Sequence, residues 1–456
     1  MENIYEKLRS RILMDGSKKA YTKFYGCAQN EADMETIRGM LQVMGYDFTD
    51  EPADADIIVI NTCAVREGAE DRIYGNVGAF KKLKEKKHDL IIVICGCMTQ
   101  RPGPADKLKK SYPYVDIVFG THGIEKFPKK LLKRLETGKR VFEIEETSEI
   151  VEGLPVKRKE SVSANVSIIY GCNNFCSYCI VPYTRGRERS RRWENIVCEV
   201  KGLAEKGVSE ITLLGQNVNS YGKDLDDGIN FAGLLRKINE IDGIKRIRFM
   251  TSHPKDLSDE LILAMSECDK VCRQLHLPIQ AGSNRVLRDM NRKYTRESYL
   301  ALVEKIRTAM PDITLTTDII VGFPNETKEE FEDTMDIIRK VRYDGIFSFI
   351  YSKRSGTPAA KMEDAISDGE KSENLSKLLE VQKEIQLEIN KNYLGKSLEV
   401  LVDERSKTDE NLLSGRTDGG KIVHFPGDAG LIGKYVNVKI KEVKSFYLTG
   451  EIEGEK

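Results

Sequence analysis

The stretch that decides the fold of this chain is residues 164–179, which read ANVSIIYGCNNFCSYC. Its first half is apolar and β-branched and ends at a glycine, which predicts a buried strand over 164–171. The thiols of Cys172, Cys176 and Cys179 follow at once in one short loop. Because active sites of α/β barrels lie at the carboxyl ends of strands, this thiol loop indicates a functional site.

The chain beyond this loop alternates strand candidates with helical patterns, which is typical of parallel strands joined by helices. Six strands are expected, at 164–171, 210–216, 246–252, 274–280, 314–323 and 346–352. Six units rather than eight predict a partial (β/α)6 barrel, which we assign to residues 158–390. A long helix, expected at 369–395, leads out of this domain.

The N-terminal part predicts a separate parallel α/β sheet domain over residues 18–140. Buried strands separated by helical patterns are expected at 19–27, 55–63, 89–97 and 114–120. The closing segment of this domain, 127–140, concentrates lysine and arginine. Residues 142–163 have mixed charge and little periodicity, and we interpret them as a linker.

The C-terminal part, residues 391–456, predicts a small antiparallel β-barrel of the oligonucleotide-binding type. Short strands with glycine-bearing turns are expected at 397–405, 411–419, 421–427, 434–443 and 446–454. The fold class is therefore α/β, with three domains in sequence.

Composition excludes several classes of protein. The 456 residues contain 72 Lys+Arg and 72 Asp+Glu, so the global charge indicates no particular partner. The longest apolar run, 90–98, is far shorter than the roughly 18 residues of a membrane span. Charged residues stand near the start, where a signal peptide needs an apolar stretch. We expect a cytoplasmic protein without a membrane segment, whose ten cysteines are reduced.

The central cysteine triplet favours an iron–sulfur cluster. Zinc prefers four tetrahedral ligands, and no fourth Cys or His lies close in sequence. Three thiolates suit a cluster that keeps one iron open to another ligand. Zinc binding and buried structural cysteines remain alternatives at this point.

A second triplet lies in the N-terminal domain, where Cys27, Cys63 and Cys97 each end one expected strand. The carboxyl ends of parallel strands meet at one edge of a sheet, so these thiols are expected to gather there and to form a second cluster. Buried strand-end cysteines are the alternative. Cys95 lies two residues before Cys97 on the strand, and we interpret it as a core residue.

The spacing C-x3-C-x2-C resembles the radical S-adenosylmethionine superfamily, and the whole pattern resembles its methylthiotransferase family. This resemblance runs from about Lys18 to Glu455 and includes the N-terminal motifs YGCAQN, INTCAV and CGCMTQ, although YGCAQN departs from the usual YGCQMN after its cysteine. It implies two 4Fe-4S clusters, S-adenosylmethionine as cofactor and a C-terminal TRAM domain. The implied ligands are Cys172, Cys176 and Cys179 for the radical cluster and Cys27, Cys63 and Cys97 for the auxiliary cluster.

The residues within the motifs distinguish the branches of this family. The segments LLGQNVNSYG, FMTSHP, HLPIQAGSN and DIIVGFPNET resemble the branch that acts on isopentenyladenosine in tRNA. The resemblance implies methylthiolation of N6-(dimethylallyl)adenosine at position 37 with two S-adenosylmethionine molecules per turnover. One molecule methylates sulfur on the auxiliary cluster, and the other yields the radical that activates carbon 2 of the adenine.

Other functions remain open on the sequence alone. Sister branches act on threonylcarbamoyladenosine in tRNA or on an aspartate of a ribosomal protein. A two-cluster electron carrier could use the same cysteines, but it would not need a six-unit barrel. An RNA-binding protein with structural zinc is a further alternative.

Cofactor contacts are expected at strand ends of the barrel. Gln216 lies where the superfamily holds the amino group of the cofactor, although glutamine replaces the usual acid. Gln280 and Ser283 lie where relatives contact the ribose. Each could instead be an ordinary polar loop residue. His276 receives no role, and no catalytic side chain is assigned.

The expected partner is the anticodon stem-loop of a tRNA, whose unpaired bases can leave their stack. The segment 185–192, RGRERSRR, follows the radical loop and could clamp phosphates, unless it is simply a solvated charged face. We also expect a monomer and an electron donor such as flavodoxin or ferredoxin; the sulfur donor is unassigned.

Overall fold

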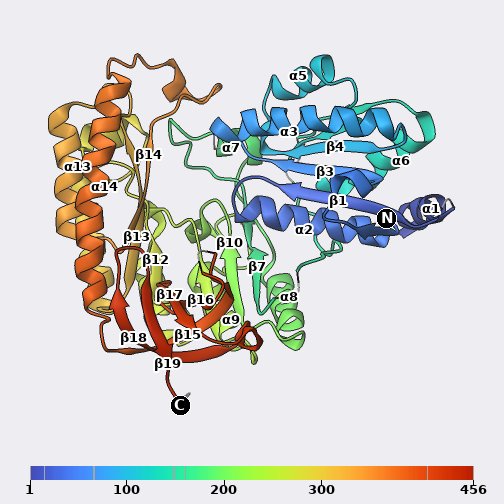
Figure 1. Cartoon of the computed structure of the whole chain (residues 1–456). Coiled ribbons are helices and arrows are strands. Elements are labelled where there is room, and N and C mark those ends of the chain that lie inside the picture. The colour runs from blue at the N-terminus through green and yellow to red at the C-terminus, as the bar shows by residue number, and fades with distance from the viewer. Residues whose placement is uncertain are drawn as a thin grey trace.

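The computed structural model describes residues 2–14, 16–64, 67–146, 149–159, 161–407 and 409–454. It consists of an N-terminal sheet domain, a central set of parallel strands with outer helices, and a small C-terminal barrel (Figure 1). The predicted α/β fold class with three parts is confirmed. No helix in the described ranges has both the length and the apolar character needed to cross a membrane.

The N-terminal sheet has six parallel strands in the order β2-β1-β3-β4-β5-β6. Their bounds are β1 (Lys18–Phe24), β2 (Tyr46–Phe48), β3 (Ile57–Thr62), β4 (Ile91–Gly96), β5 (Ile117–Phe119) and β6 (Val141–Glu143). The central strands β3 and β4 are buried along their whole length, as expected for a sheet covered on both faces.

Helices cover the two faces of this sheet. One face packs against α1 (Glu2–Leu13), α2 (Ala28–Val43) and α6 (Phe127–Thr137). The other packs against α3 (Glu67–Lys86) and α5 (Pro104–Ser111). A four-residue helix, α4 (Cys97–Gln100), follows β4 directly.

The expected linker is partly wrong, because β6 pairs with β5 and extends the sheet to Glu143. Acidic residues at its end neutralise the basic helix α6: the buried Lys130 Nζ lies 3.0 Å from Glu143 and 2.6 Å from Glu145. Further on, Gly39 of α2 has no room for a side chain, since a Cβ would lie 2.2 Å from the carbonyl oxygen of Pro155. Much of this segment is therefore packed on the N-terminal domain.

The central domain has six parallel strands, as predicted. They are β7 (Ser163–Ser167), β10 (Glu210–Leu214), β11 (Arg246–Phe249), β12 (Gln274–His276), β13 (Thr314–Val321) and β14 (Gly345–Ile350). They form two three-stranded sheets that a parallel bridge between Ile247 and Val271 joins. The helices are α8 (Trp193–Glu205), α9 (Phe231–Asn239), α10 (Asp259–Glu267), α11 (Asn284–Asp289), α12 (Arg296–Ala309), α13 (Lys328–Val341) and α14 (Asp368–Lys391).

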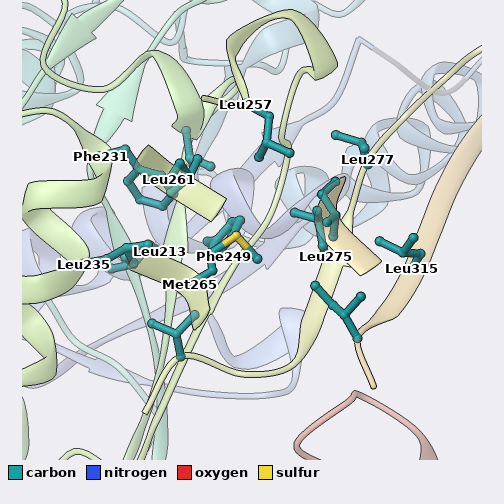
Figure 2. Close-up of a cluster of buried hydrophobic side chains, with 14 of the residues drawn as sticks. Leu213, Phe231, Leu235, Phe249, Leu257, Leu261, Met265, Leu275, Leu277 and Leu315 are labelled. Carbon is teal, nitrogen blue, oxygen red and sulfur yellow. The ribbon is translucent and has the colours of Figure 1, made fainter. Parts of the chain in front are cut away.

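The core of this domain lies between strands and outer helices (Figure 2). Phe231 of α9 and Phe249 of β11 meet edge to face, with ring centroids 5.1 Å apart. Leu261 and Met265, one helical turn apart on α10, join the same cluster. This packing holds the strand ends, and hence the loops that follow them, in place.

The C-terminal domain is a closed five-stranded barrel in the order β15-β16-β17-β19-β18. Its strands are β15 (Ser397–Arg405), β16 (Leu412–Thr417), β17 (Ile422–Pro426), β18 (Tyr435–Val443) and β19 (Leu448–Ile452). Four of its strand pairs are antiparallel, but β17 and β19 pair in parallel, so the expected fully antiparallel barrel is corrected at this seam.

Two arginines of β11 fasten this small barrel to the central domain. Arg246, at the amino end of the strand, donates to the carbonyl oxygens of Arg416 and Glu399 at 2.9 and 3.1 Å. Arg248 donates to those of Thr417 and Asp418, both at 2.8 Å. The small barrel therefore contacts the amino end of β11, whereas the thiol loop follows the carboxyl ends of strands.

Candidate functional site

The central thiol loop begins after β8 (Ile169–Tyr170), a short strand that pairs with β9 (Arg189–Ser190). Gly171 has a φ of 77°, and a Cβ there would lie 2.0 Å from the carbonyl oxygen of Arg187. Only glycine fits this position. The Gly171 N–H donates to Oε1 of Gln216 at 2.5 Å, so the end of β10 holds the start of the loop.

The three central thiols are chemically suited to bind a cluster. None of the ten cysteines forms a disulfide. Burial, together with the neighbouring Cys176 thiol, raises the pKa of Cys172 to about 11 and that of Cys179 to about 12. Among the described residues, no three Cys, His, Asp or Glu side chains converge closely enough to hold a single metal ion. The donor set of three thiols on one loop nevertheless fits an iron–sulfur cluster.

The loop after α11, more than a hundred residues further along the chain, contacts the thiol loop and supports it. The Ser177 N–H donates to the carbonyl of Met290 at 3.0 Å. The side-chain amide of Asn291 donates to the carbonyls of Asn174 and Phe175 at 3.2 and 2.9 Å. Arg292, which sequence reasoning did not identify, donates from Nη1 to Sγ of Cys176 at 3.4 Å.

The N-terminal thiols follow three adjacent strands, as the sequence predicted. Cys27 caps the start of α2 after β1, Cys63 follows β3 directly, and Cys97 begins α4 after β4. Gly26, with a φ of 130°, has no space for a Cβ, which would lie 2.8 Å from Cβ of Cys63. The backbone before Cys27 therefore packs directly against Cys63.

Asn30 organises this second thiol set, which sequence reasoning missed. Its buried amide donates to Oδ1 of Asn61 at 3.0 Å and to the carbonyl of Thr62 at 3.1 Å. The same amide lies 4.0 Å from Sγ of Cys97, and the Cys27 thiol lies 3.3 Å from Oδ1 of Asn30. The signal was present in the motifs YGCAQN and INTC, in which these asparagines accompany the cysteines.

The two thiol sets lie beside each other. Cys97 of the N-terminal set packs in one buried cluster with Ala64 and Ile180, and Ile180 follows Cys179 of the central set. Arg185, at the end of α7 (Val181–Arg185), reaches into the N-terminal domain and pairs with Asp33 at 2.8 Å. Burial would lower the pKa of Arg185, but Asp33 and the thiols of the N-terminal set raise it.

Helix α2 carries most of the polar contacts between the two domains. Gln29 donates to Oγ of Ser167 at 2.9 Å, and the amide of Asn165 donates to Glu31 at 3.3 Å. Because Cys27 caps this helix, these contacts also fix the N-terminal thiol set relative to the barrel.

The arginine run 185–192, for which a phosphate clamp and a solvated charged face were both open, is largely paired within the chain. Arg185 is buried in its pair with Asp33, and Arg191 is neutralised by Glu152 and Glu199 at 2.6 and 2.8 Å. Only Arg187 and Arg192 of this run are exposed. The run packs against α2 and α8, whose acidic residues Asp33 and Glu199 pair with it. These pairs neutralise part of its positive charge within the chain.

The expected cofactor contacts lie near the thiol loop but have structural partners. Gln216 accepts from Gly171, as described above. Gln280 is buried with a φ of 75° and bridges to Ile319 of β13. Ser283 caps α11 and donates to Glu330 at 3.1 Å. Their role toward the cofactor stays a prediction.

A cavity of about 320 Å³ lies between strands of the partial barrel and the small C-terminal barrel, with Gln274 and Gly345 at the amino ends of β12 and β14 on one side and Gly420 of the small barrel on the other. His276 and Phe347 line it, with ring centroids 5.8 Å apart, and Phe446 of the small barrel lines its far side. His276, to which the sequence assigned no role, has structural partners: its Nδ1 lies 3.0 Å from Oγ1 of Thr316 and its Nε2 lies 3.4 Å from Oδ2 of Asp318. Phe347 and Phe349 of β14 are 57% and 54% exposed, and Phe347 lines this cavity.

Cys95 belongs to the core and not to the thiol set. It is 1% exposed, packs in the cluster under β3 and β4, and its thiol faces the carbonyl of Ile60. We expect Cys95→Ala to lower the free energy of unfolding by about 1 kcal/mol through the small cavity it leaves. Chemical denaturation measures this change in stability. Iron content per chain should equal that of the unchanged protein, and loss of iron would show that Cys95 is a ligand.

Models of three families match successive parts of the chain. Residues 19–120 match the uncharacterized protein family UPF0004, residues 166–338 the radical SAM superfamily, and residues 391–452 the TRAM domain. Among solved structures, the radical S-adenosylmethionine methyltransferase TsrM from Kitasatospora setae is similar in fold, with a TM-score of 0.55 at 15% identity, covering 89% of this chain and 82% of that one.

Curated proteins are similar over nearly the whole chain. A tRNA-2-methylthio-N(6)-dimethylallyladenosine synthase of Alkaliphilus oremlandii (strain OhILAs) is 56% identical over 99% of this chain and 96% of its own length. A synthase of the same name from Clostridium perfringens (strain SM101 / Type A) is also 56% identical, over 94% of this chain and 96% of its own length.

Proposed function

The chain belongs to the family of tRNA-2-methylthio-N(6)-dimethylallyladenosine synthases, and from this premise we propose that its two thiol sets act together on one tRNA base. It is a radical S-adenosylmethionine enzyme that methylthiolates N6-(dimethylallyl)adenosine in tRNA. Position 37 beside the anticodon, and the use of two cofactor molecules per turnover, belong to the proposal. The observation that carries it is the buried cluster of Ala64, Cys97 and Ile180, in which residues of the two thiol regions pack together.

In this proposal each thiol set holds one 4Fe-4S cluster. Cys172, Cys176 and Cys179 would hold the cluster that, when bound and reduced, cleaves S-adenosylmethionine. Cys27, Cys63 and Cys97 would hold the second cluster, where sulfur is delivered. Cluster binding requires the thiols to lose their protons. The raised pKa values of Cys97 and Cys172, both about 11, make this loss less favourable. The buried guanidinium groups of Arg185 and Arg292 lie where they compensate the resulting negative charge.

The cavity lined by Phe347 supports a substrate with an apolar tail. Phe347 and Phe349 stand on the same face of β14, because residues two apart share a strand face. Met250, 46% exposed, lines the same cavity as Phe347. Exposed apolar groups gathered at a cavity mark a binding site, and a dimethylallyl group would cover them.

We expect the enzyme to prefer a base that already carries the dimethylallyl group. Burial of this tail at ~25 cal/mol per Å² is worth a few kcal/mol, so the rate should exceed that on the bare base roughly 10- to 1000-fold. Phosphate contacts cannot supply this preference, because they are the same for both substrates. The test compares one anticodon stem-loop with dimethylallyl, with threonylcarbamoyl and without modification, at fixed salt. Equal rates on bare and dimethylallylated RNA would refute the preference, and faster reaction with threonylcarbamoyl would favour the sister branch.

A substitution of Phe347, which lines the cavity, tests where the tail binds. Phe347→Ala should shrink the preference for the dimethylallyl base by about tenfold, since it removes apolar surface from the pocket. The matched control is Leu263→Ala, which removes a 51% exposed apolar side chain on α10, away from the cavity. An unchanged preference in Phe347→Ala would place the tail elsewhere.

We further propose that the partners are the anticodon stem-loop of a tRNA and a low-potential electron donor such as flavodoxin or ferredoxin, and that the chain acts as a monomer. The TRAM domain supports a tRNA substrate. Its loop residue Phe446, 68% exposed, lies at the cavity and could stack on a neighbouring unpaired base.

A further inference from the structure

Arg292 is a buried cation that touches a cluster ligand. Its Nη1 donates to Sγ of Cys176 at 3.4 Å, and its Nη2 donates to the carbonyl of Pro278 at 2.7 Å. Its Nε donates to the hydroxyl of Tyr294 at 2.7 Å. With 8% of its surface exposed, the guanidinium has little access to water.

Hydrogen bonds to the backbone of the neighbouring loops hold Arg292 in position. The preceding residues Met290 and Asn291 bond the thiol loop through Ser177, Asn174 and Phe175. The carbonyl of Pro278, just after β12, anchors the far end of the guanidinium. Hydrogen bonds therefore hold both the thiol loop that carries Cys176 and the guanidinium of Arg292 that contacts it.

A hydrogen bond to a ligand sulfur and a nearby positive charge both favour the reduced, more negative form of an iron–sulfur cluster. They act more strongly when water is excluded, because the local dielectric is low. We propose that Arg292 is a positioning residue that raises the reduction potential of the cluster on Cys172, Cys176 and Cys179, and so helps it accept one electron from a low-potential donor. This inference rests on the proposed function, which places a cluster on these thiols.

The test is a redox titration of the reconstituted full-length enzyme with titanium(III) citrate, followed by electron paramagnetic resonance. The signal that changes when S-adenosylmethionine is added identifies the cluster that binds this cofactor. Arg292→Met should lower its midpoint, so that the ratio of reduced to oxidised cluster at a fixed potential falls about tenfold, equivalent to ~59 mV for one electron. Arg292→Gln should shift it less, because its amide can still donate to the sulfur while the charge is lost.

The control is Arg288→Met, which removes an arginine one helical turn earlier whose side chain is 74% exposed. Its midpoint should equal that of the unchanged enzyme. If Arg292→Met fails to load iron, Arg292→Gln decides, and an unshifted midpoint in a variant that retains iron would overturn the role of Arg292. Absence of any S-adenosylmethionine-sensitive signal in the unchanged enzyme would instead overturn the proposed function.

Discussion

Replacing Cys172, Cys176 and Cys179 together with alanine is expected to abolish cleavage of S-adenosylmethionine and to leave about half of the iron. The reason is that these thiols are the only cysteines on the loop after β8, whereas the other set is carried by three strand ends of a different sheet. The N-terminal set should thus keep its own cluster. Release of 5′-deoxyadenosine under reducing conditions and iron per chain are the two measurements.

The matched control for this variant is Cys268→Ala with Cys272→Ala. Both residues are buried cysteines of the same domain outside the two thiol sets. Their loss should leave iron content and cofactor cleavage intact. Full iron in the triple variant would show that the central thiols bind no cluster.

Replacing Cys27, Cys63 and Cys97 together with alanine is expected to eliminate the methylthio product while cofactor cleavage continues. The central loop is held by Gln216, Met290 and Asn291, all of the central domain, so it should keep its shape. Product nucleosides from a dimethylallylated stem-loop would be measured by mass spectrometry, beside 5′-deoxyadenosine.

Cys95→Ala is the control for the second variant, because it removes a thiol two residues from Cys97 that faces the core. It should still form product. Unchanged product in the triple variant would make the N-terminal cysteines structural. Loss of cofactor cleavage there would mean that the buried cluster of Ala64, Cys97 and Ile180 supports the central loop as well.

Local pattern was sufficient for most strands and for the grouping of the thiols, but it missed β6 and did not predict that the expected strand 164–171 divides into β7 and β8. Strand runs such as 57–60 and 90–95 are apolar throughout, as expected for a sheet covered on both faces. The cysteines that end these strands were then expected at one sheet edge, since parallel strands all point the same way. Spacing within one loop likewise grouped Cys172, Cys176 and Cys179.

The fate of charged residues could not be predicted in this way. The run 185–192 resembles a phosphate clamp by composition, yet Arg185 and Arg191 are paired inside the chain. Their partners, Asp33 and Glu199, lie in other elements of the sequence. Whether an arginine faces water depends on which acidic group folding brings beside it, and short-range pattern does not contain that information.

The sequence by itself predicted the three α/β and β units and the grouping of the six cysteines, because each depends on residues close together or on strand direction. The resemblance of its motifs indicated the family. Only the tertiary structure decided that the two thiol sets adjoin, that Arg292 touches Cys176 and that the small barrel docks on β11. Cys176 and Arg292 lie 116 residues apart. Such contacts arise when separate elements pack, because close packing then selects one arrangement of side chains from many that the local sequence allows.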